Sequence, residues 1–287
     1  MVSKQTLIYD PAGAYQVDVQ QIEYLRHGND SWMATVYQPK GAGPFPALLD
    51  VHGGAWNAGN RSHSELRAPQ LAASGVVVVS IDFRLAPDHP YPAQVADLNY
   101  ATRWLKSRAE DFNADAGSVG LWGSSSGGHT VLVSAMRPKD PRYTTIALNQ
   151  GGDADATALY VICCWPIVDP YARYFFAQER NNDRLVASSE AYFLGQEAMQ
   201  EANPNLMLER GEKTVLPPVL IIQGSEDGNL PVPVTERFAE TYVKAGGSLH
   251  LEMFLGMPHG FGSSEGWEAD LAFEKMKAFI ATQVNGG

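Results

Sequence analysis

The chain has 287 residues, of which 45% are hydrophobic and 18% are charged, and this composition is typical of a soluble globular protein. Its formal net charge of −11 argues against nucleic acid or an anionic membrane surface as a partner, because both repel an acidic surface. No apolar run approaches the length that spans a bilayer, and residues 1–6 lack the pattern of a signal peptide. We therefore expect a cytoplasmic protein without a membrane span.

The first two predicted strands alternate between apolar and polar residues, as half-exposed strands do, and the later ones are continuous apolar runs. In chain order, the expected strands cover residues 17–25, 32–38, 47–51, 76–81, 118–123, 159–165, 218–223 and 248–254. Apolar spacing predicts helices over 62–74, 93–110, 233–245 and 266–283. This order predicts an α/β protein with a mostly parallel sheet, an antiparallel N-terminal edge and helices on both faces.

A serine flanked by glycines follows the fifth predicted strand. Ser125 is the central residue of Gly-Ser-Ser-Ser-Gly over residues 123–127, and a helix-compatible stretch follows. This is the G-x-S-x-G nucleophile elbow, in which a sharp strand-to-helix turn holds a serine hydroxyl clear of the sheet. Gly123 and Gly127 fit because side chains at those positions would collide in so sharp a turn.

Three further polar elements follow other predicted strands. His-Gly-Gly-Ala-Trp over 52–56 comes before the serine, whereas Asp227 and His259 come after it. A loop for an oxyanion, a serine, an acid and a histidine in this order predict a serine hydrolase. All four elements lie at the carboxyl ends of strands, where open α/β sheets place their active sites. Because they must meet in space, we expect a single domain over 1–287, with a small lid or pocket wall within 166–215.

The run Asp-Phe-Arg-Leu-Ala-Pro-Asp-His-Pro-Tyr-Pro-Ala over 82–93 resembles a signature of hormone-sensitive-lipase-like and related bacterial carboxylesterases. With the other motifs, the resemblance covers roughly residues 30–280. It implies the eight-stranded α/β-hydrolase fold, hydrolysis of carboxylic esters, and a catalytic triad of Ser125, Asp227 and His259. The compact length also resembles a smaller acetyl- and feruloyl-esterase-like branch.

Two motifs depart from the pattern of the resembled esterases. Ser124 and Ser126 flank the serine where an acidic residue and an alanine are frequent, and the early loop reads His-Gly-Gly-Ala-Trp rather than His-Gly-Gly-Gly. The form His-Gly-Gly-x-Trp also resembles the corresponding loop of kynurenine formamidases. An amidase or arylformamidase is therefore the alternative reaction, and a ligand-binding protein on an inactive hydrolase scaffold is the alternative of another class.

A serine hydroxyl is a weak nucleophile at neutral pH and needs a base, which in turn needs an orienting acid. We hypothesise that His259 takes the proton from Ser125 and returns it to the leaving group, while Asp227 holds the imidazole. Glu226 and Asp169 are rival acids. Asp227 is preferred because the acid of the resembled family follows this strand at this offset.

A tetrahedral intermediate carries a negative oxygen that needs N–H donors. We expect Ser126 to donate one from the helix start, and Gly54 and Ala55 to donate from the early loop. Trp56 and Trp165 are candidates for the walls of the substrate pocket, although core packing explains either one as well.

Other chemistries lack their motifs in this sequence. There is no H-E-x-x-H, no Cys/His cluster at ligand spacing and no G-x-G-x-x-G, so we expect neither a metal nor another cofactor. Cys163 and Cys164 are adjacent in a predicted strand and are expected to be buried thiols. The expected partner is a small-molecule ester, and the residues leave open whether the chain forms a homodimer.

Overall fold

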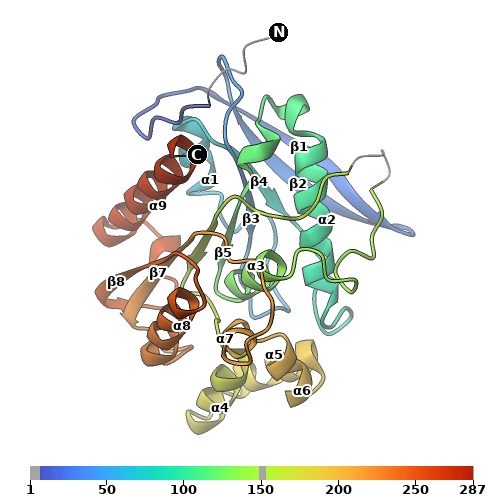
Figure 1. Cartoon of the computed structure of the whole chain (residues 1–287), viewed down its shortest axis with the longest axis vertical. Helices are drawn as coiled ribbons and strands as arrows, with labels where there is room; N and C mark the ends of the chain where they lie inside the picture. The colour runs from blue at the N-terminus through green and yellow to red at the C-terminus, as the bar shows by residue number, and fades with distance from the viewer. Residues whose placement is uncertain (1–6, 149–152, 287) are drawn as a thin grey trace.

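The computed structural model of the chain describes residues 7–148 and 153–286. Its centre is an eight-stranded sheet in the order β1-β2-β4-β3-β5-β6-β7-β8 (Figure 1). The strands are β1 (Val17–His27), β2 (Asp30–Pro39), β3 (Ala47–Val51), β4 (Val77–Ile81), β5 (Gly120–Ser124), β6 (Val161–Cys164), β7 (Val219–Glu226) and β8 (Leu249–Pro258). Among these strands the pairs β1–β2 and β2–β4 are antiparallel, and the other five neighbouring pairs are parallel. The predicted α/β-hydrolase sheet with an antiparallel edge is confirmed.

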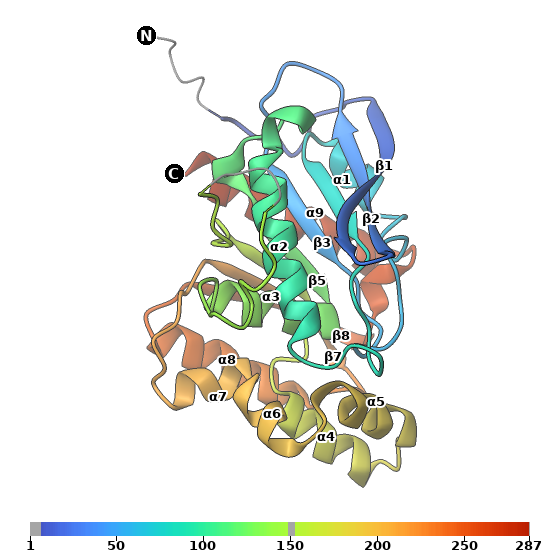
Figure 2. The same cartoon turned by 90° about the vertical axis from the view of Figure 1, so that its right-hand side faces the viewer.

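Alternate residues of the central strands pack against helices on opposite faces of the sheet. On one face, Leu49 packs in the core covered by α2 (Ala93–Ser107), α3 (Ser126–Met136) and α8 (Val232–Lys244). On the other face, Leu48 packs in the core covered by α1 (Ala68–Ala73) and α9 (Trp267–Asn285). Figure 2 shows the two helical layers with the sheet between them. Because side chains alternate along a strand, a fully apolar strand such as β4 fills both cores.

The helix expected over 62–74 is shorter than predicted. α1 begins at Ala68, and residues 61–67 form turns instead. Pro69 lacks an N–H and fits only the first turn of a helix, which explains a start at Ala68. Ser64, within the turns, donates its hydroxyl to Asp50 at 3.0 Å, so this segment is tied to the end of β3.

Four short helices follow β6, in the segment predicted to hold a pocket wall. They are α4 (Pro170–Glu179), α5 (Asp183–Phe193), α6 (Gln196–Glu201) and α7 (Pro204–Glu209). Together they lie at one end of the molecule, at the bottom of Figures 1 and 2. Short 3-10 helices cover Ala109–Phe112, Ala116–Ser118 and Phe261–Ser263. Within the described residues, no helix is long and apolar enough to cross a membrane.

The two cysteines are buried and free, as predicted. Trp122 donates its indole N–H to the sulfur of Cys164 at 3.4 Å, while Cys163 faces the opposite core. Burial raises the pKa of both thiols, so they remain protonated at neutral pH. Their position supports a packing role.

One carboxyl group lies inside the sheet with two hydroxyl partners. Asp50 is 3% exposed, and its two oxygens accept hydrogen bonds from Ser64 at 3.0 Å and Ser80 at 2.6 Å. Burial raises the pKa of Asp50 to about 6, although both hydroxyls lower it. The folded chain therefore retains a proton on this group at pH values where the unfolded chain has lost it.

Replacing Asp50 with Asn should remove this pH dependence from folding. Because the pKa of Asp50 is higher in the folded chain, its contribution to stability is greatest below about pH 4 and is lost as the pH rises through about 6. The difference in unfolding free energy between the natural chain and Asp50→Asn should fall by about 3 kcal/mol over this range. Urea unfolding at a series of pH values measures it. A difference that is independent of pH would contradict the assignment.

Candidate active site

Ser125 occupies a strained position between β5 and α3. Its backbone has φ 54° and ψ −119°, a conformation that non-glycine residues rarely adopt. A Cβ on Gly123 would lie 2.5 Å from the carbonyl oxygen of Gly127, and one on Gly127 would collide with the carbonyl oxygens of Val51 and His52. The turn therefore needs glycine at both positions, and it presents the Ser125 hydroxyl at the carboxyl edge of the sheet.

Two segments far along the chain bring an imidazole and a carboxylate to this hydroxyl. The hydroxyl of Ser125 lies 2.9 Å from Nε2 of His259, and Nδ1 of His259 lies 2.8 Å from Oδ2 of Asp227. β7 and β8 extend beyond their predicted ends to Glu226 and Pro258, next to these two residues. The structure thus joins all three predicted residues in one chain of hydrogen bonds.

The carboxylate of Asp227 is held by donors on several sides. It is 8% exposed and accepts from the side chain of Gln223 at 2.8 Å and the backbone N–H of Asn229 at 2.8 Å, besides His259. Burial raises its pKa, but the hydrogen bond and charge of His259, with the other donors, hold the pKa of Asp227 below its ordinary value. It is therefore ionised at neutral pH and suited to orient the imidazole.

The rival acids lie elsewhere. Glu226 is exposed at the end of β7. Asp169 caps α4, where Oδ1 accepts from the N–H of Ala172 at 2.8 Å and from the side chain of Asn203 at 2.7 Å. These contacts explain Asp169 as a structural residue.

The loop after β3 lies against the start of α3. The N–H of Trp56 donates to the hydroxyl of Ser126 at 3.2 Å, which fixes the distance between loop and helix. Gly54 and Ala55 line the pocket that contains Ser125, and both have positive φ values of 116° and 53°. No described residue accepts a hydrogen bond from the N–H of Gly54, Ala55 or Ser126. These three amides are therefore free to bind a ligand oxygen.

His52 braces the same loop from within the core. Its Nδ1 donates to the carbonyl of Gly53 at 2.6 Å, and its ring stacks on Phe83 with centroids 4.2 Å apart. Burial lowers the pKa of His52 to about 4, so the ring is neutral at physiological pH. A neutral donor in this position supports the loop.

The pocket above Ser125 and His259 has walls from several parts of the chain. Trp165 lines it, with its ring centroid 6.4 Å from that of His259. The full lining is Gly53, Gly54, Ala55, His63, Ser125, Trp165, Arg173, Arg184, Leu185, Asn229, His259, Gly260 and Ser263. α4 and α5 thus supply one side of the pocket, through Arg173, Arg184 and Leu185.

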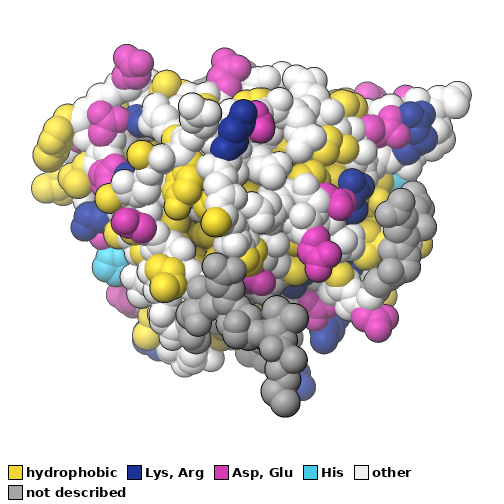
Figure 3. All heavy atoms as spheres, turned by 90° about the horizontal axis from the view of Figure 1, so that it is seen from above, with side chains coloured by type: hydrophobic (Ala, Val, Ile, Leu, Met, Phe, Trp, Pro, Cys, Tyr) yellow, Lys and Arg dark blue, Asp and Glu magenta, His cyan; other side chains and the backbone are white. Residues whose placement is uncertain are grey.

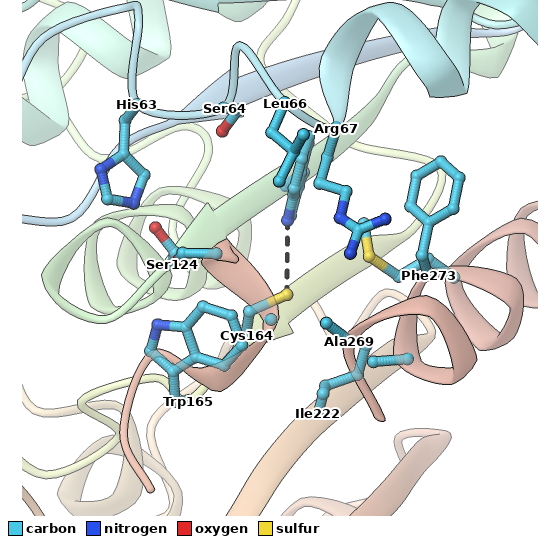
Figure 4. Close-up of a pocket in the computed structure, with 15 residues that line it drawn as sticks. His63, Ser64, Leu66, Arg67, Ser124, Cys164, Trp165, Ile222, Ala269 and Phe273 are labelled. Atoms are coloured by element: carbon cyan, nitrogen blue, oxygen red, sulfur yellow. Dashed lines mark hydrogen bonds between the residues drawn. The ribbon is translucent and has the colours of Figure 1, made fainter. Parts of the chain in front are cut away.

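A second, mostly apolar pocket lies behind the elbow, between the sheet and α9 (Figure 4). His63, Trp165 and Ser263 line both pockets. Figure 4 shows Trp165 beside Ser124, with Phe273 of α9 at the far side. Trp165 therefore forms part of the boundary between the two pockets.

Of its two expected positions, pocket wall or core, Trp56 takes the core. It is 1% exposed, and its ring stacks on Tyr192 of α5 with centroids 5.2 Å apart. Its indole N–H donates to Nδ1 of His129 at 3.2 Å, and Nε2 of His129 donates to the carbonyl of Ala202 at 2.7 Å. Through these contacts the side chain joins the loop after β3 to α5 and to the helix of His129.

Several residues of the site have no motif that would identify them. Gln223 and Asn229 hold Asp227, and Arg173 and Arg184 line the pocket. The only signal in the sequence for the two arginines is their place within 166–215, the segment expected to form a pocket wall. Their approach to the site depends on how α4 and α5 pack.

Known structures resemble this fold over most of its length. Thermogutta terrifontis esterase 2, phosphorylated by paraoxon, has a TM-score of 0.72 and 21% identity, with 96% of this chain and 95% of that one covered. An esterase from Pyrobaculum calidifontis has a TM-score of 0.75 and 24% identity, with 94% and 86% covered. These likenesses show the fold.

The sequence relatives include esterase LipC of Mycobacterium tuberculosis, which is 30% identical over 234 residues. That match covers 78% of this chain and 55% of LipC, so the chain spans about half the length of this relative. Carboxylesterase NlhH of the same species is 34% identical over 97 residues, which are 33% of this chain and 30% of NlhH. The BD-FAE family model matches residues 34–242, which are most of the chain. The chain therefore belongs to the BD-FAE family of α/β-hydrolases.

Proposed function

We propose that this chain is a carboxylesterase that cleaves small-molecule esters through an acyl-enzyme intermediate. Ser125 is the nucleophile, His259 the general base and acid, and Asp227 the orienting acid. The chain of hydrogen bonds from Ser125 through His259 to Asp227 is the observation that supports this most strongly. The esterase names of LipC and NlhH support the same class of reaction.

In the acylation step, Oγ of Ser125 attacks the ester carbonyl while Nε2 of His259 takes the hydroxyl proton. The carbonyl oxygen becomes negative and accepts hydrogen bonds from the N–H groups of Gly54, Ala55 and Ser126, which form the oxyanion hole. Asp227 stabilises the imidazolium. As the tetrahedral intermediate collapses, the bond to the alcohol oxygen breaks and His259 gives that oxygen its proton, which leaves an acyl group on Ser125.

In the deacylation step, a water molecule replaces the alcohol. His259 takes a proton from the water, and the resulting oxygen attacks the acyl carbonyl. The second tetrahedral intermediate uses the same N–H donors. Its collapse breaks the bond to Oγ of Ser125, which recovers its proton from His259, and the carboxylic acid leaves. The cycle needs no cofactor.

The organisation that we propose is a single domain over residues 1–287, in which 166–215 forms a wall of the pocket. Arg173, Arg184 and Leu185 from α4 and α5 line the pocket together with Ser125 and His259, which supports this role. Trp56 packs against Tyr192 of α5 and supports a stable position of this wall.

Replacing Ser125 with Ala should abolish turnover of p-nitrophenyl esters, because it removes the attacking oxygen. Ser134→Ala provides a matched control, since Ser134 is buried in α3, the helix that follows Ser125, and its hydroxyl has no hydrogen-bond partner among the described residues. Initial rates and circular dichroism spectra of both variants check the expectation. Turnover by Ser125→Ala at a rate near that of the control would contradict the proposal.

Replacing Asp227 with Asn should lower kcat by about 10³- to 10⁴-fold, because an amide holds the imidazole in the wrong tautomer. Glu226→Gln removes the exposed neighbouring carboxylate and should leave kcat unchanged. Steady-state kinetics on one ester compare the two variants. Equal losses in both, or a larger loss in Glu226→Gln, would show that the acid is misassigned.

A further inference from the structure

A buried arginine without a carboxylate partner lies beside the proposed nucleophile. Arg173 is 1% exposed and lines the same pocket as Ser125 and His259. Its Nη1 donates to the carbonyl of Leu185 at 3.3 Å and to the hydroxyl of Ser189 at 2.7 Å, whereas no described residue accepts from Nε. A buried guanidinium with no counter-ion is unfavourable, and an anionic ligand in the pocket would relieve this cost.

A second arginine lines the same pocket from the neighbouring helix. Arg184 in α5 is exposed, and within the described part of the chain neither it nor Arg173 forms an ion pair. Most of the other described arginines are paired, as Arg67 is with Asp270 at 2.8 Å, whereas Arg103 and Arg180 also have no carboxylate within ion-pair distance in the described part of the chain. Burial and the charge of Arg184 lower the pKa of Arg173 to about 10, so Arg173 remains charged at neutral pH and is repelled by Arg184.

The charge of the pocket differs from that of the whole chain. The chain has 32 acidic and 21 basic residues, yet the lining of this pocket, among the described residues, includes two arginines and no Asp or Glu. On the outer face in Figure 3, by contrast, basic and acidic side chains lie interspersed. A locally positive pocket in an acidic protein is suited to attract a negative group past a repulsive surface.

Packing against Trp56 explains only part of this arrangement. The guanidinium of Arg173 lies 5.1 Å from the ring centroid of Trp56, a cation–π contact that makes the buried charge tolerable. That contact supplies no hydrogen-bond acceptor: Nε has none among the described residues, and Nη1 donates only to Leu185 and Ser189. It also does not account for Arg184, which comes to the pocket from another helix.

We propose that this pocket selects esters that carry a carboxylate, which Arg173 and Arg184 bind while Ser125 attacks the ester bond. The inference rests on the proposed function, since it names the substrate class of the same site. Arg173 supplies a fixed guanidinium, and Arg184 supplies a second charge at the more exposed side of the pocket. They are specificity-determining residues, because an ester without a charge reacts at the same serine without their help.

Two pairs of esters test the proposal and locate the carboxylate. In the first pair the charge is on the acyl part: p-nitrophenyl hydrogen glutarate against p-nitrophenyl pentanoate. In the second pair it is on the alcohol part: p-acetoxybenzoate against its methyl ester. In one of the two pairs, the natural chain should hydrolyse the anionic ester with a kcat/KM about 10- to 100-fold higher than that for the neutral ester. Raised salt concentration should reduce this preference.

Arg184→Gln is the main variant, because Arg184 is exposed and its loss leaves the fold intact. It should raise KM for the preferred anionic ester about tenfold or more and change the kinetics on the neutral ester by less than about twofold. Arg173→Gln should show the same pattern, and Arg173→Lys should restore part of the preference because it keeps the charge. Arg180→Gln is the control, since Arg180 lies at the exposed end of α4 and does not line the pocket.

The outcomes separate this inference from the proposed function. Turnover of the neutral esters without any preference for an anionic partner would overturn this inference alone. An equal loss on neutral and anionic esters in both Arg184→Gln and Arg173→Gln would also overturn it, because that pattern indicates a structural role. No turnover of any of the four esters by the natural chain would overturn the proposed function and this inference together.

Discussion

The imidazole of His259 connects Ser125 with Asp227, and the geometry of the whole site depends on its two hydrogen bonds. One reaches Ser125, which begins a helix near the middle of the chain, and the other reaches Asp227 after β7. Both partners lie at the carboxyl edge of one parallel sheet, where consecutive strands of this kind end together. The sheet therefore sets a distance that the local sequence around His259 could not set by itself.

Close backbone packing at the elbow makes this geometry possible. Gly127 lies so near the carbonyls of Val51 and His52 that any side chain there would displace the loop after β3. That loop provides the free N–H groups of Gly54 and Ala55. The same small residue thus sets both the position of Ser125 and its distance from these free amides. Two buried residues support this loop. Asp50 accepts hydrogen bonds from two serine hydroxyls, and His52 donates to the backbone carbonyl of Gly53.

The sheet and Ser125 could be predicted from local patterns in the sequence, whereas the choice of Asp227 over its rivals needed the family resemblance. Continuous apolar runs identify buried strands, and glycine at fixed offsets identifies the turn at Ser125. The side chain of Trp56 could not be placed, since an aromatic residue after a glycine loop is equally compatible with a pocket wall and with the core. Its position depends on Tyr192, far along the chain. Arg173 was missed for the same reason, because the packing of α4 and α5 brings it to the pocket.

Covalent labelling tests directly whether Ser125 is the nucleophile. The chain should be incubated with paraoxon, digested and analysed by mass spectrometry. We expect one phosphoryl adduct, on Ser125, with loss of esterase activity in proportion to labelling. An adduct on another residue that accompanies inactivation, or full inactivation with Ser125 unmodified, would contradict it.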